Sequence, residues 1–276
     1  MSDDTPFLKI ASQWLVAAFL VSVLIILFVF IAAVQITSET AGLPILRRAV
    51  AVTTNIDATL PELEAGLHVA AKDSTVENVR LPGFPIPVEI PRAEAGELGG
   101  AELRNRILDQ SAGLLYDDGM SVWDDSDPEG SQRIDRVSTA GGIHRGFGLI
   151  RDSWHIFFIV LAALFGALAL LIAAVLLLTL TPPMRLVVLG AVLAVSGVLS
   201  LAAAVAVRFA LRTAQTEADP FEDGLLGLGV DTVWIMIRNC LILSVLGVSI
   251  LAVSSLALHW QSRAGRQSAP STDANL

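Results

Sequence analysis

The chain has 276 residues, of which 54% are hydrophobic and 16% are charged, and its formal net charge is −9. Soluble domains carry about 25% charged residues, so the composition excludes an ordinary soluble protein and favours a membrane protein. The acidic balance argues against a nucleic-acid partner, because an acidic surface repels phosphates.

The first membrane-spanning helix is predicted over residues 14–36, after a tail of residues 1–13. This stretch contains no ionisable residue and exceeds the roughly 18–20 apolar residues that a helix needs to cross a bilayer core of about 30 Å. A cleaved signal peptide is the alternative. Its apolar region would be only about 7–15 residues long and would follow a basic segment, whereas the preceding MSDDTPFLK has two acids and one lysine. We therefore expect an uncleaved anchor.

The next segment, residues 37–153, has the composition of a small soluble domain. Residues 38–151 hold 11 Lys and Arg and 18 Asp and Glu, which gives −7 of the net charge. Helical spacing of apolar residues over 45–56 indicates a helix that prolongs the first span. TLPE at 59–62 resembles a capping box that starts a helix through about Lys72. Residues 101–116 form an amphipathic helix with Leu103, Ile107 and Leu114 on one face.

The stretch LPGFPIPVEIP, residues 81–91, decides how this segment is classified. Its apolar residues Phe84, Ile86, Val88 and Ile90 alternate with three prolines and a glutamate, as in a half-buried edge strand. STVENVR at 74–80 is the expected partner strand, and LPGF fits a type II turn. We therefore predict a β-hairpin and a small α+β domain, with a disordered linker or a membrane-dipping hairpin as alternatives.

This segment contains only weak candidates for a metal-binding, phosphate-binding or cofactor site. DSDPEG places Asp125, Asp127 and Glu129 like the start of a calcium loop, but the position that needs a bidentate glutamate is Arg136. A solvated acidic loop is the simpler interpretation. GGIHRGFG at 141–148 matches no phosphate-binding motif, and YDDG at 116–119 is explained by a helix C-cap. The histidines show no metal-ligand spacing, so we expect no cofactor.

Three more spans follow. They are predicted over residues 154–180, 186–211 and 232–260, and the first two are joined by the tight turn TPPMR at 181–185. Residues 212–231 are predicted to be an acidic, glycine-rich loop, and residues 261–276 a disordered tail. The fold class is therefore an α-helical integral membrane protein with four transmembrane helices and an α+β extramembrane domain between the first two.

Individual residues support the spans. Tryptophans that flank the spans are expected to anchor them at the lipid interface: Trp14, Trp154, Trp234 and Trp260. Small residues mark the faces on which the helices pack, within the chain or between copies: Gly166, Gly190, Gly197 and Gly247. Arg238 is the one charge near the interior of a span and hence a functional candidate, although its long stem could reach the interface.

Orientation and function are less constrained. A count of all positive charges near the spans favours residues 37–153 inside. The short loops favour both termini in the cytoplasm of a prokaryotic cell and residues 37–153 outside the cell membrane, and we follow the short loops because long domains cross largely regardless of charge. We expect a non-enzymatic role in anchoring, in sensing or as an accessory subunit, with the lipid bilayer and other membrane proteins as partners. An oligomeric transporter or channel component is one alternative. A membrane enzyme is another, and its acids would be Asp117, Asp118, Asp124, Asp125 and Asp127.

Overall fold

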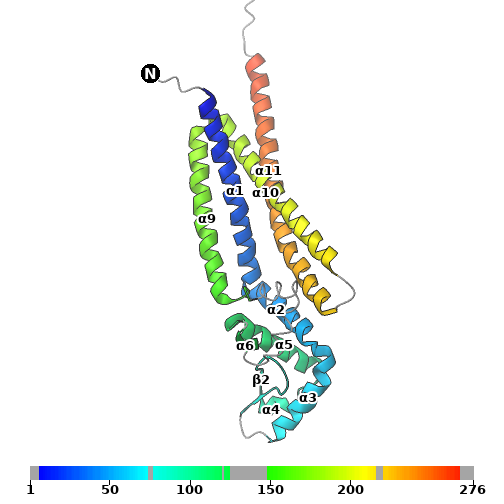
Figure 1. The fold of residues 1–276 in the computed structure, drawn as a ribbon. Helices are drawn as coiled ribbons and strands as arrows, with labels where there is room; N and C mark the ends of the chain where they lie inside the picture. The colour runs from blue at the N-terminus through cyan, green and yellow to red at the C-terminus, as the bar shows by residue number, and fades with distance from the viewer. Residues whose placement is uncertain (1–5, 74–76, 120, 125–147, 216–219, 268–276) are drawn as a thin grey trace, which may run out of the picture. The chain divides into compact units, whose positions relative to one another are not determined.

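A computed structural model gives the structure of residues 6–73, 77–119, 121–124, 148–215 and 220–267. The chain is mostly helical (Figure 1). The long helices are α1 (Pro6–Thr37), α9 (Asp152–Thr179), α10 (Pro182–Ala214) and α11 (Pro220–Gln267). The shorter elements are α2 (Glu39–Thr54), α3 (Ile56–Asp73), β1 (Asn78–Arg80), β2 (Glu89–Pro91), α4 (Arg92–Ala95), α5 (Gly100–Asp117) and α6 (Ser121–Asp124).

The chain divides into two compact units. The first, which we call the bundle, comprises Met1–Ala32, Val160–Ala206 and Met236–Leu276. The second, which we call the module, comprises Ala33–Ile159 and Val207–Ile235. The module thus includes a stretch that lies far from the rest of it in the sequence, between the third and fourth long helices.

Four helices in the described residues are long and apolar enough to cross a membrane, in agreement with the prediction of four spans. They cover Ala11–Thr37, Asp152–Thr179, Met184–Ala214 and Leu226–Trp260. Their outward side chains are large and apolar; Leu170 and Leu178 of α9, for example, are 74% and 80% exposed. Such surfaces are stable when lipid tails solvate them. The chain is therefore a multi-pass membrane protein.

Within the bundle, α10 and α11 cross each other (Figure 1). They approach closely at glycines. A β-carbon on Gly190 would lie 2.7 Å from the backbone nitrogen of Leu251, and one on Gly197 would lie 2.7 Å from that of Ser244. A β-carbon on Gly247 would overlap the backbone of Ala194. Glycine allows this approach because it has no side chain. Close approach matters in lipid, where no hydrophobic effect drives association and van der Waals packing must hold the helices together.

The pair α1 and α9 packs differently, through larger side chains. Leu20 of α1 and Leu176 of α9 are buried in one apolar cluster, and the rings of Phe30 and Phe165 lie 5.2 Å apart. The sequence groups Gly166 with the packing glycines, but a β-carbon on this residue would lie 4.0 Å from the Leu27 side chain. A side chain at position 166 would therefore meet ordinary van der Waals contact.

Two matched substitutions test this difference. We expect Gly247→Ala to destabilise the purified protein by about 1–3 kcal/mol, because the added methyl group would overlap the backbone of Ala194 and force α10 and α11 apart. Gly166→Ala, the same change on α9, should be close to neutral, because its methyl group would meet only ordinary van der Waals contact. Thermal unfolding in detergent measures both variants. Equal losses of stability in the two variants would contradict the assigned packing.

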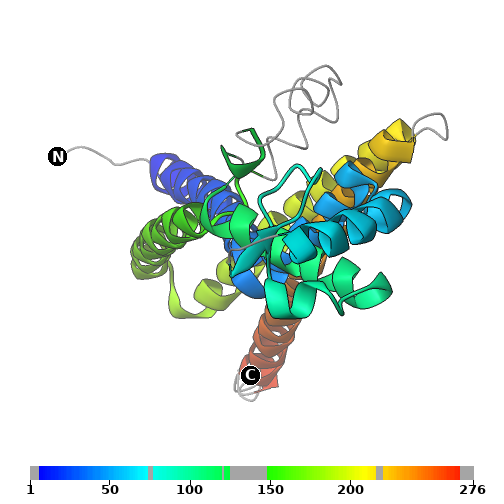
Figure 2. The same ribbon diagram turned by 90° about the horizontal axis from the view of Figure 1, so that it is seen from below.

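The module has an apolar core of its own, built from α2, α3, α5 and the hairpin (Figure 2). Leu46, Leu67, Leu103 and Ile107 are among its most deeply buried side chains. Leu103 and Ile107 face the core as predicted, whereas Leu114 is only partly buried and Leu115 takes the core position. The core forms because these helices each carry one apolar face, which is buried against the others.

LPGFPIPVEIP is part of this core. Phe84, Ile86, Val88 and Ile90 are all buried, which contradicts a membrane-dipping hairpin. The turn at Pro82–Gly83 forms, with Gly83 at φ +75°. The strand prediction is only partly correct: β1 and β2 pair antiparallel, with Val79 opposite Ile90, but residues 84–88 form no strand. Proline has no N–H to donate to a ladder, and the Val88 N–H instead donates to the Ile86 carbonyl at 2.7 Å.

Two helix boundaries also differ from the prediction. The helix expected to start at Thr59 starts at Ile56, because Asn55 adopts a left-handed conformation (φ +47°) and ends α2. Thr59 therefore lies inside α3. The helix expected over 45–56 is α2, which starts at Glu39 and is separated from α1 by Ser38 alone.

The largest correction concerns residues 212–231, where the sequence predicts a loop. Helix α10 continues to Ala214, and α11 begins at Pro220. Glycine lowers helix propensity by about 1 kcal/mol per residue, which makes this stretch resemble a loop. Packing outweighs that cost here, because Leu226, Leu228 and Val230 are buried. Pro220 is well placed, since proline suits the first helical position.

Candidate functional site

The module contains a cavity of about 180 Å³ between α2 and the start of α11. Residues of one face of each helix line it. The contributions are Ala41, Pro44, Ile45 and Arg48 from α2 and Leu228, Asp231, Thr232 and Ile235 from α11. Both sets are spaced three and four residues apart, so each forms a single stripe on its helix. Six of the lining residues are apolar or small, and Arg48 and Asp231 bring opposite charges to it.

Close contacts beside the cavity hold the two helices together. Leu228 is 7% exposed and belongs to the module's core. A β-carbon on Gly224 would lie 2.6 Å from a methyl of Val52 on α2. The Thr232 hydroxyl donates to the Leu228 carbonyl within α11 at 2.8 Å, so its hydrogen-bonding need is met inside its own helix. The cavity wall is therefore formed by tightly packed helices rather than by a loop.

Arg48 and Asp231 form an ion pair across this site. Nη1 of Arg48 lies 3.4 Å from Oδ2 of Asp231, and the two side chains are 67% and 68% exposed. An exposed pair at this distance contributes little to stability, because solvent screens it and two flexible side chains must be ordered. The pair can therefore open at small cost when another charged group approaches.

A second polar cluster joins the ends of α1 and α9 to α5. The Tyr116 hydroxyl donates to the Thr37 carbonyl at 3.0 Å, and the Thr37 hydroxyl lies 3.1 Å from Nδ1 of His155. Burial, followed by the negative charges of Asp152, Glu39 and Asp117, raises the pKa of Tyr116. The phenol is therefore a neutral hydrogen-bond donor. This cluster ties the end of α1 and the start of α9 to α5 within the module.

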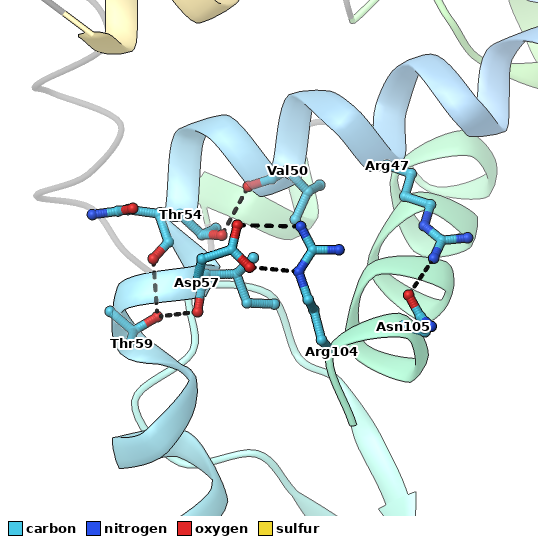
Figure 3. Close-up of polar contacts among 9 residues, drawn as sticks. Arg47, Val50, Thr54, Asp57, Thr59, Arg104 and Asn105 are labelled. Carbon is cyan, nitrogen blue, oxygen red and sulfur yellow. Dashed lines mark hydrogen bonds and ion pairs between the residues drawn. The ribbon is translucent and has the colours of Figure 1, made fainter. Parts of the chain in front are cut away.

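A third set of polar contacts lies on the surface of α2, α3 and α5 (Figure 3). Arg104 contacts both carboxylate oxygens of Asp57, at 2.6 and 3.2 Å, and Arg47 donates to Asn105 at 2.6 Å. The hydrogen bond from Arg104 lowers the pKa of Asp57. The carboxylate is thus held ionised by a partner that occupies both of its oxygens. The set connects α2, α3 and α5 through exposed polar side chains.

The tryptophans that flank the predicted spans are all on the surface. Trp14, Trp154, Trp234 and Trp260 are 74%, 38%, 54% and 70% exposed. Arg208 lies over the Trp234 ring, with its Cζ 4.8 Å from the ring centre. Arg238 is exposed one turn further along α11.

The acidic residues considered for chemistry are not brought together in the described part of the chain. Asp117 and Asp118 are exposed at the end of α5, where Gly119 (φ +77°) closes the helix. Asp125, Asp127 and Glu129 lie outside the described residues, as do residues 141–147 and the side chain of Asp124. Within the described residues, no group of three or more His, Cys, Asp or Glu could hold a metal ion.

The cavity is hard to find from the sequence because half of its wall resembles a loop. A signal is present in the spacing of Leu228, Asp231, Thr232 and Ile235. These residues repeat at helical intervals, as the lining residues of α2 do. Three glycines in the same stretch obscure this pattern: Gly224, Gly227 and Gly229.

Comparison of the chain with known protein families, with curated proteins and with solved structures finds no match. The class of protein therefore rests on the fold. It is a multi-pass membrane protein with four apolar helices and a second compact unit that has its own core.

The contact between Leu228 and the module core can be tested directly. We expect Leu228→Ala to cost about 2–5 kcal/mol of stability, because it leaves a cavity in a buried apolar cluster. Ile242→Ala on the same helix is the matched control, since Ile242 is 62% exposed and its loss should cost little. Thermal unfolding of the full chain in detergent, followed by hydrogen exchange over α2 and α5, measures both. Unchanged exchange in the Leu228 variant would contradict the assigned core.

Proposed function

We propose that the chain is a non-enzymatic sensor or accessory subunit of a membrane assembly. In this proposal the module binds a ligand or partner, and α11 carries the effect of binding into the membrane. The observation that supports it most directly is Leu228. This residue belongs to α11, yet it is buried in the module's core together with residues of α2, α3 and α5.

The length of α11 supports the same proposal. Its 48 residues extend for about 72 Å at 1.5 Å per residue. A bilayer with its headgroups is only about 40–45 Å thick, so a single helix is long enough to span the membrane and also reach beyond it. The part of α11 through Ile235 belongs to the module, and the part from Met236 belongs to the bundle. A shift of the module's core around Leu228 would therefore be felt along a continuous helix.

The module also offers an exposed apolar position at which binding can be tested. Val69 on α3 is 61% exposed, although other apolar residues of α3, such as Leu63 and Leu67, face the core. A large apolar side chain in water is common when it stands alone. Its position on the module nevertheless makes it a suitable place to install a reporter of binding.

Photo-crosslinking tests whether the module has a partner. A photoreactive amino acid at Val69 is expected to give an adduct of one discrete mass in intact cells, because a bound partner shields a fixed site. The same amino acid at Leu178, which is 80% exposed on α9, should give lipid adducts alone. If Val69 and the exposed position Ala101 on α5 both yield no protein adduct, the partner-binding role is wrong.

We further propose that the module lies outside the cytoplasm, with both termini inside. The positive charges of the short TPPMR turn and the C-terminal tail support this orientation. The module would then meet extracellular or periplasmic partners rather than cytoplasmic ones.

Cysteine labelling tests the orientation. In a Cys240→Ala background, we expect Ala101→Cys to react with a membrane-impermeant thiol reagent in intact cells. Thr181→Cys, an exposed position in the turn between α9 and α10, should react only after lysis. The reverse pattern would place the module in the cytoplasm and contradict the proposed orientation.

A further inference from the structure

We propose that the cavity between α2 and α11 binds the headgroup of a zwitterionic aminophospholipid. In this site, Arg48 holds the lipid phosphate and Asp231 holds the ammonium group. This inference needs only that the four helices span a bilayer. It does not depend on the proposed partner or on which side of the membrane the module occupies.

The position of the cavity along both helices points to a lipid. On the α2 side, the first span ends at Thr37, and the lining residues begin at Ala41, about one turn later. On the α11 side, the last lining residue is Ile235, which is next to Trp234. Tryptophan is enriched at the headgroup level of membranes. The α2 wall therefore lies just beyond the first span, and the α11 wall lies within the first ten residues of the fourth span, Leu226–Trp260. Exposed polar groups near the end of a span meet lipid headgroups as well as water.

The charges of the site match a zwitterion. Arg48 and Asp231 provide one positive and one negative group 3.4 Å apart. An ethanolamine phospholipid carries the complementary charges, a negative phosphate for Arg48 and a positive ammonium for Asp231. Arginine recognises phosphate through several N–H donors in one plane. A primary ammonium has three N–H donors for a carboxylate. Because the ion pair is exposed and weak, a headgroup can insert between its partners or align beside them.

The same charges disfavour other common headgroups. A choline group has no N–H to donate, so its contact with Asp231 would lack hydrogen bonds. The anionic headgroup of phosphatidylglycerol has no cation, and Asp231 would repel it. The size of the cavity, about 180 Å³, is below the roughly 300–1,000 Å³ of pockets that enclose a drug-sized ligand. It therefore suits a headgroup, with the half-buried apolar residues Ile45 and Ile235 facing the start of the acyl chains.

Native mass spectrometry of the full-length protein in detergent tests this site. The probes are phosphatidylethanolamine, phosphatidylcholine and phosphatidylglycerol with identical acyl chains, added at equal concentration. We expect the ethanolamine lipid to occupy the protein about tenfold more than the choline lipid. That factor is the difference expected for one hydrogen bond to a charged group.

The variants separate the two roles. Asp231→Asn should abolish the preference for ethanolamine over choline, and Arg48→Gln should weaken the binding of both lipids. Arg106→Gln is the matched control. It removes another exposed arginine of the module, paired with Glu94 at 3.5 Å, and should leave the preference unchanged. Ala41→Leu keeps both charges but fills the cavity, so it should also lower occupancy by the ethanolamine lipid.

Each outcome decides the proposal. Equal binding of the three lipids by the wild-type protein overturns it, as does a stronger binding of phosphatidylglycerol, which would indicate simple attraction of anions to arginine. A preference that survives both Asp231→Asn and Ala41→Leu places the lipid elsewhere and also overturns it. Thermal unfolding of every variant in the same detergent confirms that the comparison is made between folded proteins.

Discussion

The structure depends on the requirement that backbone polar groups be hydrogen-bonded wherever water is absent. In a bilayer core, an α-helix meets this requirement within one segment, which is why the most apolar stretches of the chain form uninterrupted helices. Helix α9 illustrates the constraint, because its 28 residues carry large apolar side chains that are mostly exposed in the isolated chain. With the backbone satisfied, only packing remains to hold helices together. Glycines at Gly197 and Gly247 let α10 and α11 reach that packing.

Outside the spans, burial of apolar side chains from water takes over as the organising interaction. The hairpin shows this change from backbone hydrogen bonding to side-chain burial. In LPGFPIPVEIP the prolines prevent a regular ladder, yet Ile86, Val88 and Ile90 are fully buried. Side-chain burial therefore fixes this segment where backbone pairing cannot. The same drive brings Leu228 into the module from a distant part of the sequence, so that the module's core is completed by a helix that also belongs to the bundle.

The sequence predicts the features that depend on backbone hydrogen bonding in the spans and on apolar burial between residues close in the chain. Long uncharged runs predict the four spans, and alternation predicts which side of 84–90 is buried. Prediction fails where a distant contact overrides a local preference. Residues 212–231 contain enough glycine and acid to resemble a loop, yet the part from Pro220 onward is helical, where Gly224 packs on Val52. Asn55, with its left-handed backbone, moves the start of α3 away from the apparent cap at Thr59. The cavity is not predicted either, because half of its lining residues come from the start of α11, which the sequence predicts to be a loop.

The position of Asp231 connects these points. An acidic residue within the fourth apolar helix is costly in hydrocarbon, so its carboxylate must find either water, a headgroup or a cation. Arg48 supplies the cation, but from a helix that follows the first span directly. The ion pair therefore links the chain that leaves the first span to the helix that forms the fourth, through exposed side chains for which headgroups can compete. Because the exposed pair contributes little and the packing of Gly224 and Leu228 holds α2 against α11, a headgroup can displace the pair without separating the two helices.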